Sequence, residues 1–131
     1  MNILNIEDDA FKHHDICKVV NENGSHNIDW VMYLDEAISK IESQISLGKP
    51  YNLIITDMYY PASKGGAEEQ SGEILIKKAK EIQPAIPIII CSSCIYNNAD
   101  AFGTIYYSER EDWELKLSNL IAKIKHILVQ E

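Results

Sequence analysis

The chain has 131 residues, the length of one domain with a single hydrophobic core. Hydrophobic residues make up 46% and charged residues 24%, as in a soluble globular protein, and no apolar run approaches the roughly 20 residues of a membrane span. The net charge of −8 argues against direct binding to nucleic acid or to an anionic membrane surface. An odd number of cysteines and a start without signal-peptide features favour a cytoplasmic protein.

The pattern of apolar residues predicts strands alternating with helices. In chain order the expected elements are strand Asn2–Ile6, helix Ala10–Asn23, strand Ile28–Met32, helix Leu34–Leu47, strand Leu53–Thr56, helix Gly72–Gln83, strand Pro87–Cys91, strand Thr104–Tyr107 and a helix from Trp113 to Leu128. Strands separated by helices imply right-handed crossovers and a parallel sheet covered on both faces. No linker or repeat divides the chain, so residues 1–131 are expected to form one domain.

Two connections have unusual lengths. The segment Pro61–Gln70 is a long, polar, glycine-containing loop, and loops of this size in a small domain tend to be functional or disordered. Only Cys94–Gly103 separates the fourth strand from the fifth, so a helix there has two turns at most. Ser108 and Glu111 have the spacing of a capping box before the last helix.

Carboxylates follow two of the predicted strands. Glu7, Asp8 and Asp9 come after the first strand, and Asp57 comes after the third. The carboxyl ends of parallel strands share one edge of the sheet, which is where ligands bind in open α/β folds. Clustered carboxylates repel one another and raise one another's pKa, so the cluster predicts a cation site or a reaction site. Solvated loop acids are the alternative reading.

Several residues around this cluster have a recognisable spacing. They are the acid pair Glu7 and Asp8, the single Asp57, Pro61 four residues later, the Ser71–Leu75 sequence Ser-Gly-Glu-Ile-Leu, and Ser92 at the end of the fourth strand. In these features the whole chain resembles the CheY-like receiver domain of bacterial response regulators. The resemblance implies a flavodoxin-like three-layer α/β fold, with five parallel strands in the order 2-1-3-4-5. The chain departs from the family in the short Cys94–Gly103 segment, which predicts a shortened fourth helix.

The resemblance also implies a site chemistry. Asp57 would accept a phosphoryl group from a histidine kinase or phosphotransfer protein, while Glu7, Asp8, Asp57 and the backbone carbonyl of Tyr59 would hold Mg²⁺. The Ser92 hydroxyl would reorient towards the phosphate. These residue types suit the reaction, because a carboxylate can attack phosphorus and the negative phosphoryl group needs neutralising charge.

The chain departs from the family pattern on the fifth strand. Tyr107 stands where the family has a lysine that pairs with the phosphate, and no lysine lies between Lys80 and Lys116. The switch aromatic falls on Thr104, so Tyr106 is the nearby candidate for that role. A replacement cation is expected from Lys64 in the long loop or from Arg110.

The sequence therefore predicts a stand-alone, monomeric receiver that uses Mg²⁺, passes its signal to a downstream protein, and has at most autophosphorylation and autodephosphorylation activity. The alternative is a pseudo-receiver that binds a protein partner without phosphorylation. A small phosphohydrolase is disfavoured, because Asp57 lacks the second aspartate of a D-x-D motif. Two further motifs remain open: Cys91 and Cys94 as a redox pair, and His13, His14 and Cys17 as zinc ligands, with structural roles favoured for both.

Overall fold

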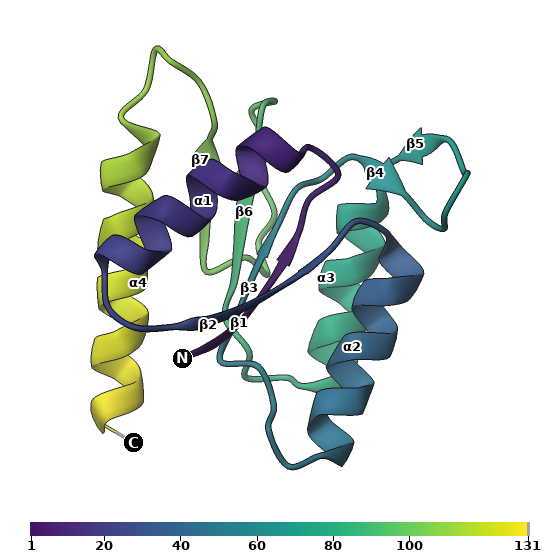
Figure 1. The fold of residues 1–131 in the computed structure, drawn as a ribbon, viewed down its shortest axis with the longest axis horizontal. Coiled ribbons are helices and arrows are strands. Elements are labelled where there is room, and N and C mark those ends of the chain that lie inside the picture. The colour runs from purple at the N-terminus through teal and green to yellow at the C-terminus, as the bar shows by residue number, and fades with distance from the viewer. Residues whose placement is uncertain (131) are drawn as a thin grey trace.

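Five parallel strands form the central sheet of the computed structural model, which describes residues 1–130 (Figure 1). Their order is β2-β1-β3-β6-β7, so the predicted 2-1-3-4-5 order of a flavodoxin-like fold is confirmed. The strands are β1 (Asn2–Ile6), β2 (Asn27–Val31), β3 (Leu53–Thr56), β6 (Ile88–Ser92) and β7 (Gly103–Tyr106). Strand β1 lies between β2 and β3, which places the loops after β1 and β3 side by side.

Helices cover both faces of this sheet. Helices α1 (Ala10–Glu22) and α4 (Trp113–Gln130) lie on one face, and α2 (Leu34–Ser46) and α3 (Ser71–Ile82) lie on the other (Figure 1). Successive strand side chains point to opposite faces, so Ile3 packs in the α1/α4 core while Leu4 packs in the α2/α3 core. The three central strands β1, β3 and β6 are buried on both faces, as a parallel sheet requires, whereas the edge strands β2 and β7 are partly exposed.

The long connection after β3 contains a small hairpin. Strands β4 (Tyr60–Pro61) and β5 (Glu68–Glu69) pair antiparallel, and Gly65 between them has a φ of +83°, which favours glycine. Tyr60 is fully buried, whereas the hairpin residues from 63 to 70 are exposed. The predicted polar loop is thus anchored at its start and folds back on itself above α3 (Figure 1).

No helix forms between β6 and β7 in the described structure, so the predicted short helix is absent rather than shortened. The side chain of Asn98 instead accepts a hydrogen bond from the Asp100 backbone at 2.8 Å, and the Phe102 amide donates to Ile88 at 2.8 Å. Asparagine and aspartate side chains that bond to nearby backbone favour turns over helix.

The two helix starts on the α1/α4 face are capped by aspartates. Asp9 Oδ1 accepts hydrogen bonds from the backbone of Phe11 and Lys12 at the start of α1. Asp112 Oδ1 accepts from Leu115 at 3.2 Å at the start of α4, so the predicted Ser108–Glu111 capping box is wrong. Both caps satisfy amides that have no partner within the helix.

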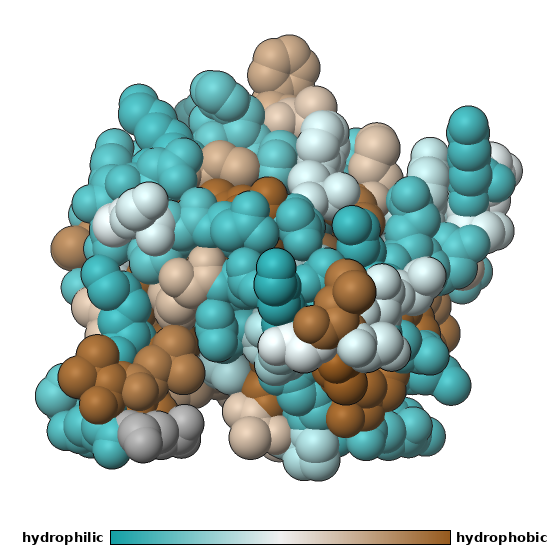
Figure 2. All heavy atoms as spheres, turned by 60° about the horizontal axis from the view of Figure 1, so that its bottom comes forward, coloured by the Kyte–Doolittle hydropathy of each residue, from teal (hydrophilic) through white to brown (hydrophobic). Residues whose placement is uncertain are grey.

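The surface around the amino-terminal ends of the strands, opposite the carboxylates, carries both hydrophobic and hydrophilic side chains. Figure 2 shows hydrophobic side chains gathered in separate places on this face, among hydrophilic ones. Leu47, just after α2, and Val129, at the end of α4, are among the large hydrophobic residues that are exposed. Among the described residues, no helix is long and apolar enough to cross a membrane.

Candidate functional site

Three carboxylates meet at the carboxyl ends of β1 and β3. One oxygen from each of Glu7, Asp8 and Asp57 lies within 4.8 Å of the others. Backbone hydrogen bonds fix their positions: the Glu7 amide donates to Val31 at 3.0 Å, and the Asp57 amide donates to Ile6 at 3.1 Å. Glu7 is buried, while Asp8 and Asp57 are half-buried and open to the surface.

A lysine that sequence reasoning missed enters this cluster from α1. Lys12 is only 2% exposed, and its Nζ lies 2.9 Å from Glu7 Oε1 and 3.4 Å from Asp57 Oδ2. The same ammonium donates a hydrogen bond to the Cys91 carbonyl at 2.7 Å. Lys12 therefore bridges the carboxylates and the end of β6.

The replacement cation was predicted from the wrong part of the chain. Lys64 and Arg110 are both exposed, and the ion pairs of Glu7 and Asp57 come from Lys12 instead. A signal for Lys12 was present in the sequence: it stands one turn before Ile16 on the apolar stripe of α1. A charged residue on a buried helix face needs a charged partner, because burying an unpaired charge is costly.

The cluster changes the pKa of its members. Burial raises the pKa of Glu7 to about 7, with a further contribution from the Asp57 charge and opposition from Lys12. Burial also raises the pKa of Asp8. For Lys12, burial opposes the charged form, but the Glu7 and Asp57 carboxylates outweigh it and the pKa is raised. Lys12 is therefore a cation at neutral pH.

The β6 and β7 ends form the other side of the site. Ser92 is buried and its Oγ accepts a hydrogen bond from the Cys94 backbone at 3.2 Å. Tyr106 is half-buried and pairs with Ser92 in the sheet register. The Tyr107 amide donates to the Ser92 carbonyl at 2.8 Å, which ties the two strand ends together.

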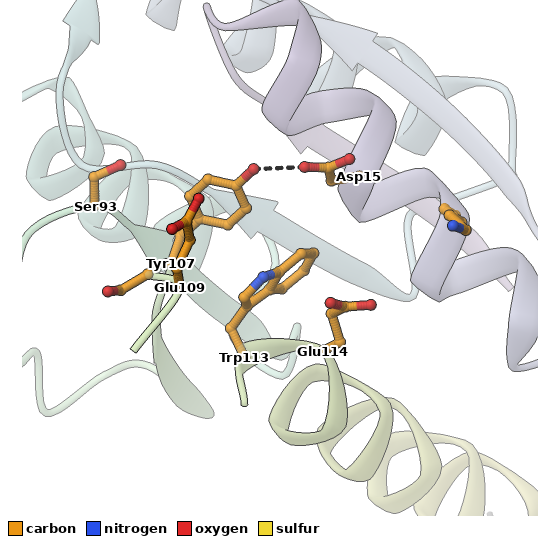
Figure 3. Close-up of a pocket in the computed structure, with 8 residues that line it drawn as sticks. Asp15, Ser93, Tyr107, Glu109, Trp113 and Glu114 are labelled. Atoms are coloured by element: carbon orange, nitrogen blue, oxygen red, sulfur yellow. Dashed lines mark hydrogen bonds between the residues drawn. The ribbon is translucent and has the colours of Figure 1, made fainter. Parts of the chain in front are cut away.

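Tyr107, at the position of the family lysine, is directed away from the carboxylates. Its hydroxyl donates to Asp15 Oδ2 at 2.6 Å, and its ring packs against Trp113 beside a cavity of about 430 Å³ (Figure 3). The ring centroid lies 5.5 Å from the Lys12 ammonium, within the range of a cation–π contact. Lys12 therefore lies between Tyr107 and the acids.

The Ser-Gly pair that opens α3 supports the loop after Asp57. Ser71 Oγ donates to the Tyr60 carbonyl, and the Gly72 amide donates to Met58 at 3.1 Å. A Cβ on Gly72 would lie 2.6 Å from the Asp57 carbonyl oxygen. This close approach explains the need for glycine at position 72. The Tyr59 hydroxyl accepts a hydrogen bond from the Gln70 side chain at 3.0 Å, which ties the residue to the end of the hairpin.

The Cys91/Cys94 pair and the His13/His14/Cys17 group are the two remaining motifs. Cys91 is buried in β6 and Cys94 is exposed, and both are free thiols. His13 stacks on Trp30 with ring centroids 4.2 Å apart, and its Nε2 lies 3.4 Å from Cys17 Sγ. Among the described residues, only the Glu7, Asp8 and Asp57 group has the spacing of a metal site with three or more ligands.

The carboxylate cluster fits a divalent cation. When all three carboxylates are ionised they carry three negative charges and Lys12 carries one positive charge, which leaves two negative charges for a dication. The raised pKa of Glu7 and of Asp8 means that a bound cation would also favour their ionised forms. Glu7 Oε1 is buried with the Lys12 ammonium 2.9 Å away, and a carboxylate oxygen has a second lone pair that can bind a ligand. Carboxylate oxygens are the donors that Mg²⁺ and Mn²⁺ prefer.

Several solved structures with a similar fold are receiver domains. A signal receiver domain of an HD domain-containing protein from Pseudomonas fluorescens is similar, with 11% identity, a TM-score of 0.71, and coverage of 99% of this chain and 98% of that one. The N-terminal domain of a response regulator/sensory box/GGDEF protein from Carboxydothermus hydrogenoformans has 16% identity, a TM-score of 0.69, and coverage of 99% and 98%. The Mn²⁺-bound response regulator Rcp1 has 16% identity, a TM-score of 0.64, and coverage of 91% and 90%.

No protein-family model and no curated protein matches the sequence. The chain nevertheless has the fold of the response-regulator receiver domains, and its carboxylates lie at the strand ends where the resemblance predicted them. The likeness is one of fold, because the identities are low.

Proposed function

We propose that this domain is a receiver that accepts a phosphoryl group on Asp57 with the help of Mg²⁺. The observation that carries the proposal is the group of Glu7, Asp8 and Asp57 with ligand atoms within 4.8 Å of one another. The receiver fold of the chain and the Mn²⁺ bound by Rcp1 support the same reading. The phosphoryl donor is proposed to be a histidine kinase or a phosphotransfer protein, and the output a protein partner.

In this proposal Asp57 is the nucleophile. Its Oδ1 accepts a hydrogen bond from the Met58 amide at 2.7 Å, which holds the carboxylate in place at the end of β3. Glu7, Asp8, Asp57 and the Tyr59 carbonyl would hold Mg²⁺, and the bound cation supplies charge neutralisation for the phosphoryl oxygens. Ser92 and Tyr106, joined by the β6–β7 register, are proposed to respond to the phosphate.

The experiment is phosphoryl uptake from acetyl phosphate and Mg²⁺, followed by intact-mass measurement. Wild type should gain one phosphoryl group and Asp57→Asn should gain none. Asp9→Asn is the matched control, because it removes an adjacent charge while asparagine still caps α1, so this variant should be labelled like wild type.

A pseudo-receiver is the second candidate function. It is favoured by Tyr107 at the lysine position and by Lys12, which already pairs with the carboxylates. A folded wild type that takes up no phosphoryl group, yet binds a protein partner, would favour this alternative. Turnover of phosphate esters would instead favour a phosphohydrolase. The stand-alone role and the monomeric state stay predictions.

A further inference from the structure

The cation at the carboxylate cluster comes from α1 and not from the end of β7. Lys12 Nζ lies 3.4 Å from Asp57 Oδ2, and the carboxylate of Asp57 is the proposed phosphoryl acceptor. We propose that Lys12 is a catalytic residue that binds the phosphoryl oxygens during transfer to Asp57, in the role that the resemblance gives to a lysine at position 107. This inference rests on the proposed function.

The contacts of the ammonium allow this role. A lysine has three N–H donors. One is directed to the Cys91 carbonyl, and the other two contacts are with Glu7 and Asp57. A phosphoryl group bonded to Asp57 places new anionic oxygens beside this carboxylate, so the donor that faces Asp57 can pass to one of them. The contacts with Glu7 and Cys91 would keep Lys12 in position.

The transfer balances without any proton from Lys12. An Asp57 carboxylate oxygen forms a bond to phosphorus, while the bond from phosphorus to the leaving group breaks. With acetyl phosphate the leaving acetate takes the electron pair, and with a phosphohistidine the imidazole nitrogen takes it. Lys12 stays protonated and stabilises the charge on the transferring oxygens, an interaction that is strongest in a buried site.

The place of Tyr107 supports the idea that the cation has moved from position 107 to position 12. Its ring centroid is 5.5 Å from the Lys12 ammonium, so position 107 still borders the place where the cation lies. A lysine at position 107 could therefore bring an ammonium to the same region from β7. This gives the proposal a rescue experiment within the chain itself.

The rate of phosphoryl uptake from acetyl phosphate and Mg²⁺ tests the proposal. Lys12→Met should slow uptake by about 10- to 100-fold, the range for losing a hydrogen bond to a charged group. Lys12→Arg should retain most of the rate because it keeps the charge. Lys64→Met is the matched control, since this lysine is exposed on the hairpin, and it should react like wild type. The double variant Lys12→Met/Tyr107→Lys should take up the phosphoryl group faster than Lys12→Met alone, because the lysine at position 107 restores a cation beside the site.

A measurement on wild type covers the case in which Lys12→Met does not fold. In protein with ¹⁵N-labelled lysine side chains, beryllofluoride with Mg²⁺ should shift the Lys12 Nζ resonance and leave that of Lys64 unchanged. An unchanged Lys12 resonance, or a folded Lys12→Met that reacts at the wild-type rate, would overturn the inference and leave the proposed function intact. A wild type that neither takes up phosphate nor binds beryllofluoride would overturn both.

Discussion

The two sides of the site differ in how closely they follow the receiver pattern. On the β1/β3 side, Glu7, Asp8 and Asp57 form the carboxylate group that the resemblance predicts. On the β6/β7 side, the lysine position holds Tyr107 and the segment before β7 has no helix within the described residues. Lys12 contacts both sides, since it pairs with the acids and donates to Cys91. The difference shows that a charge can be kept while the element that supplies it changes.

The largest expected effect compares Lys12 with Tyr107. Lys12→Met leaves buried Glu7 without its cation, and breaking a buried pair in this way costs about 3–5 kcal/mol. Tyr107→Phe removes one hydroxyl bond to Asp15 and should cost only about 1 kcal/mol. Urea denaturation of the metal-free proteins gives both values. Equal costs for the two variants would break the distinction between the two sides.

The second expected effect is the gain in stability when Mg²⁺ binds the carboxylate cluster of Glu7, Asp8 and Asp57. Mg²⁺ binds the folded site and should raise the free energy of unfolding by about 2.7 kcal/mol at a hundred times its dissociation constant. Asp8→Asn removes one ligand and should lose most of this gain. Asp9→Asn should keep it, because Asp9 caps α1 and lies outside the ligand group. Thermal melting with and without Mg²⁺ measures the gain, and equal losses in both variants would contradict the assignment.

The third effect concerns the loop that carries Asp57. Gly72→Ala would bring a Cβ to 2.6 Å from the Asp57 carbonyl oxygen and 2.7 Å from Met58 Cα, so the backbone must move. We expect a loss of about 1–3 kcal/mol together with weaker Mg²⁺ binding. Denaturation and Mg²⁺ titration test this. A variant with wild-type stability and metal affinity would show that the loop and α3 can separate without cost.

The smallest expected effect is a dependence of the free energy of unfolding on pH, which comes from His13 in α1. Partial burial lowers the pKa of His13 below 6.5, with a further contribution from His14. The folded protein then binds this proton less well than the unfolded chain, so the stability from His13 is full above 6.5 and is lost as the pH falls through the lowered pKa. His13→Phe keeps a ring to stack on Trp30 and should flatten the loss below pH 6.5.

The control for this pH effect is His126→Gln, at an exposed position on α4, which should leave the slope unchanged. Denaturation midpoints across the acidic range measure the slope. If the denaturation midpoints of His13→Phe and wild type fall equally steeply with decreasing pH, His13 does not contribute to the pH dependence of stability.

Local patterns predicted the sheet because apolar periodicity and the acid positions follow directly from chain order. The β1 and β3 ends are neighbours in any such sheet, so Glu7, Asp8 and Asp57 could be grouped before the structure. Lys12 could not be placed in the same way. Its role depends on the angle at which α1 crosses the sheet, which chain order does not give, so the expected cations were Lys64 and Arg110 instead. The sequence predicted a short helix between β6 and β7 where the described structure has a turn, because the turn at Asn98 depends on single side-chain hydrogen bonds that no periodic pattern reveals.

The position of Lys12 also bears on how this site can change over generations. Two of the three clustered carboxylates, the α1 cap and the cation all fall between Glu7 and Lys12, within one short coding segment. A single segment of this kind can be inherited or exchanged as a unit. The residues after β7 are thereby released from an electrostatic requirement, and natural variation should accumulate there while the stretch from Glu7 to Lys12 stays fixed.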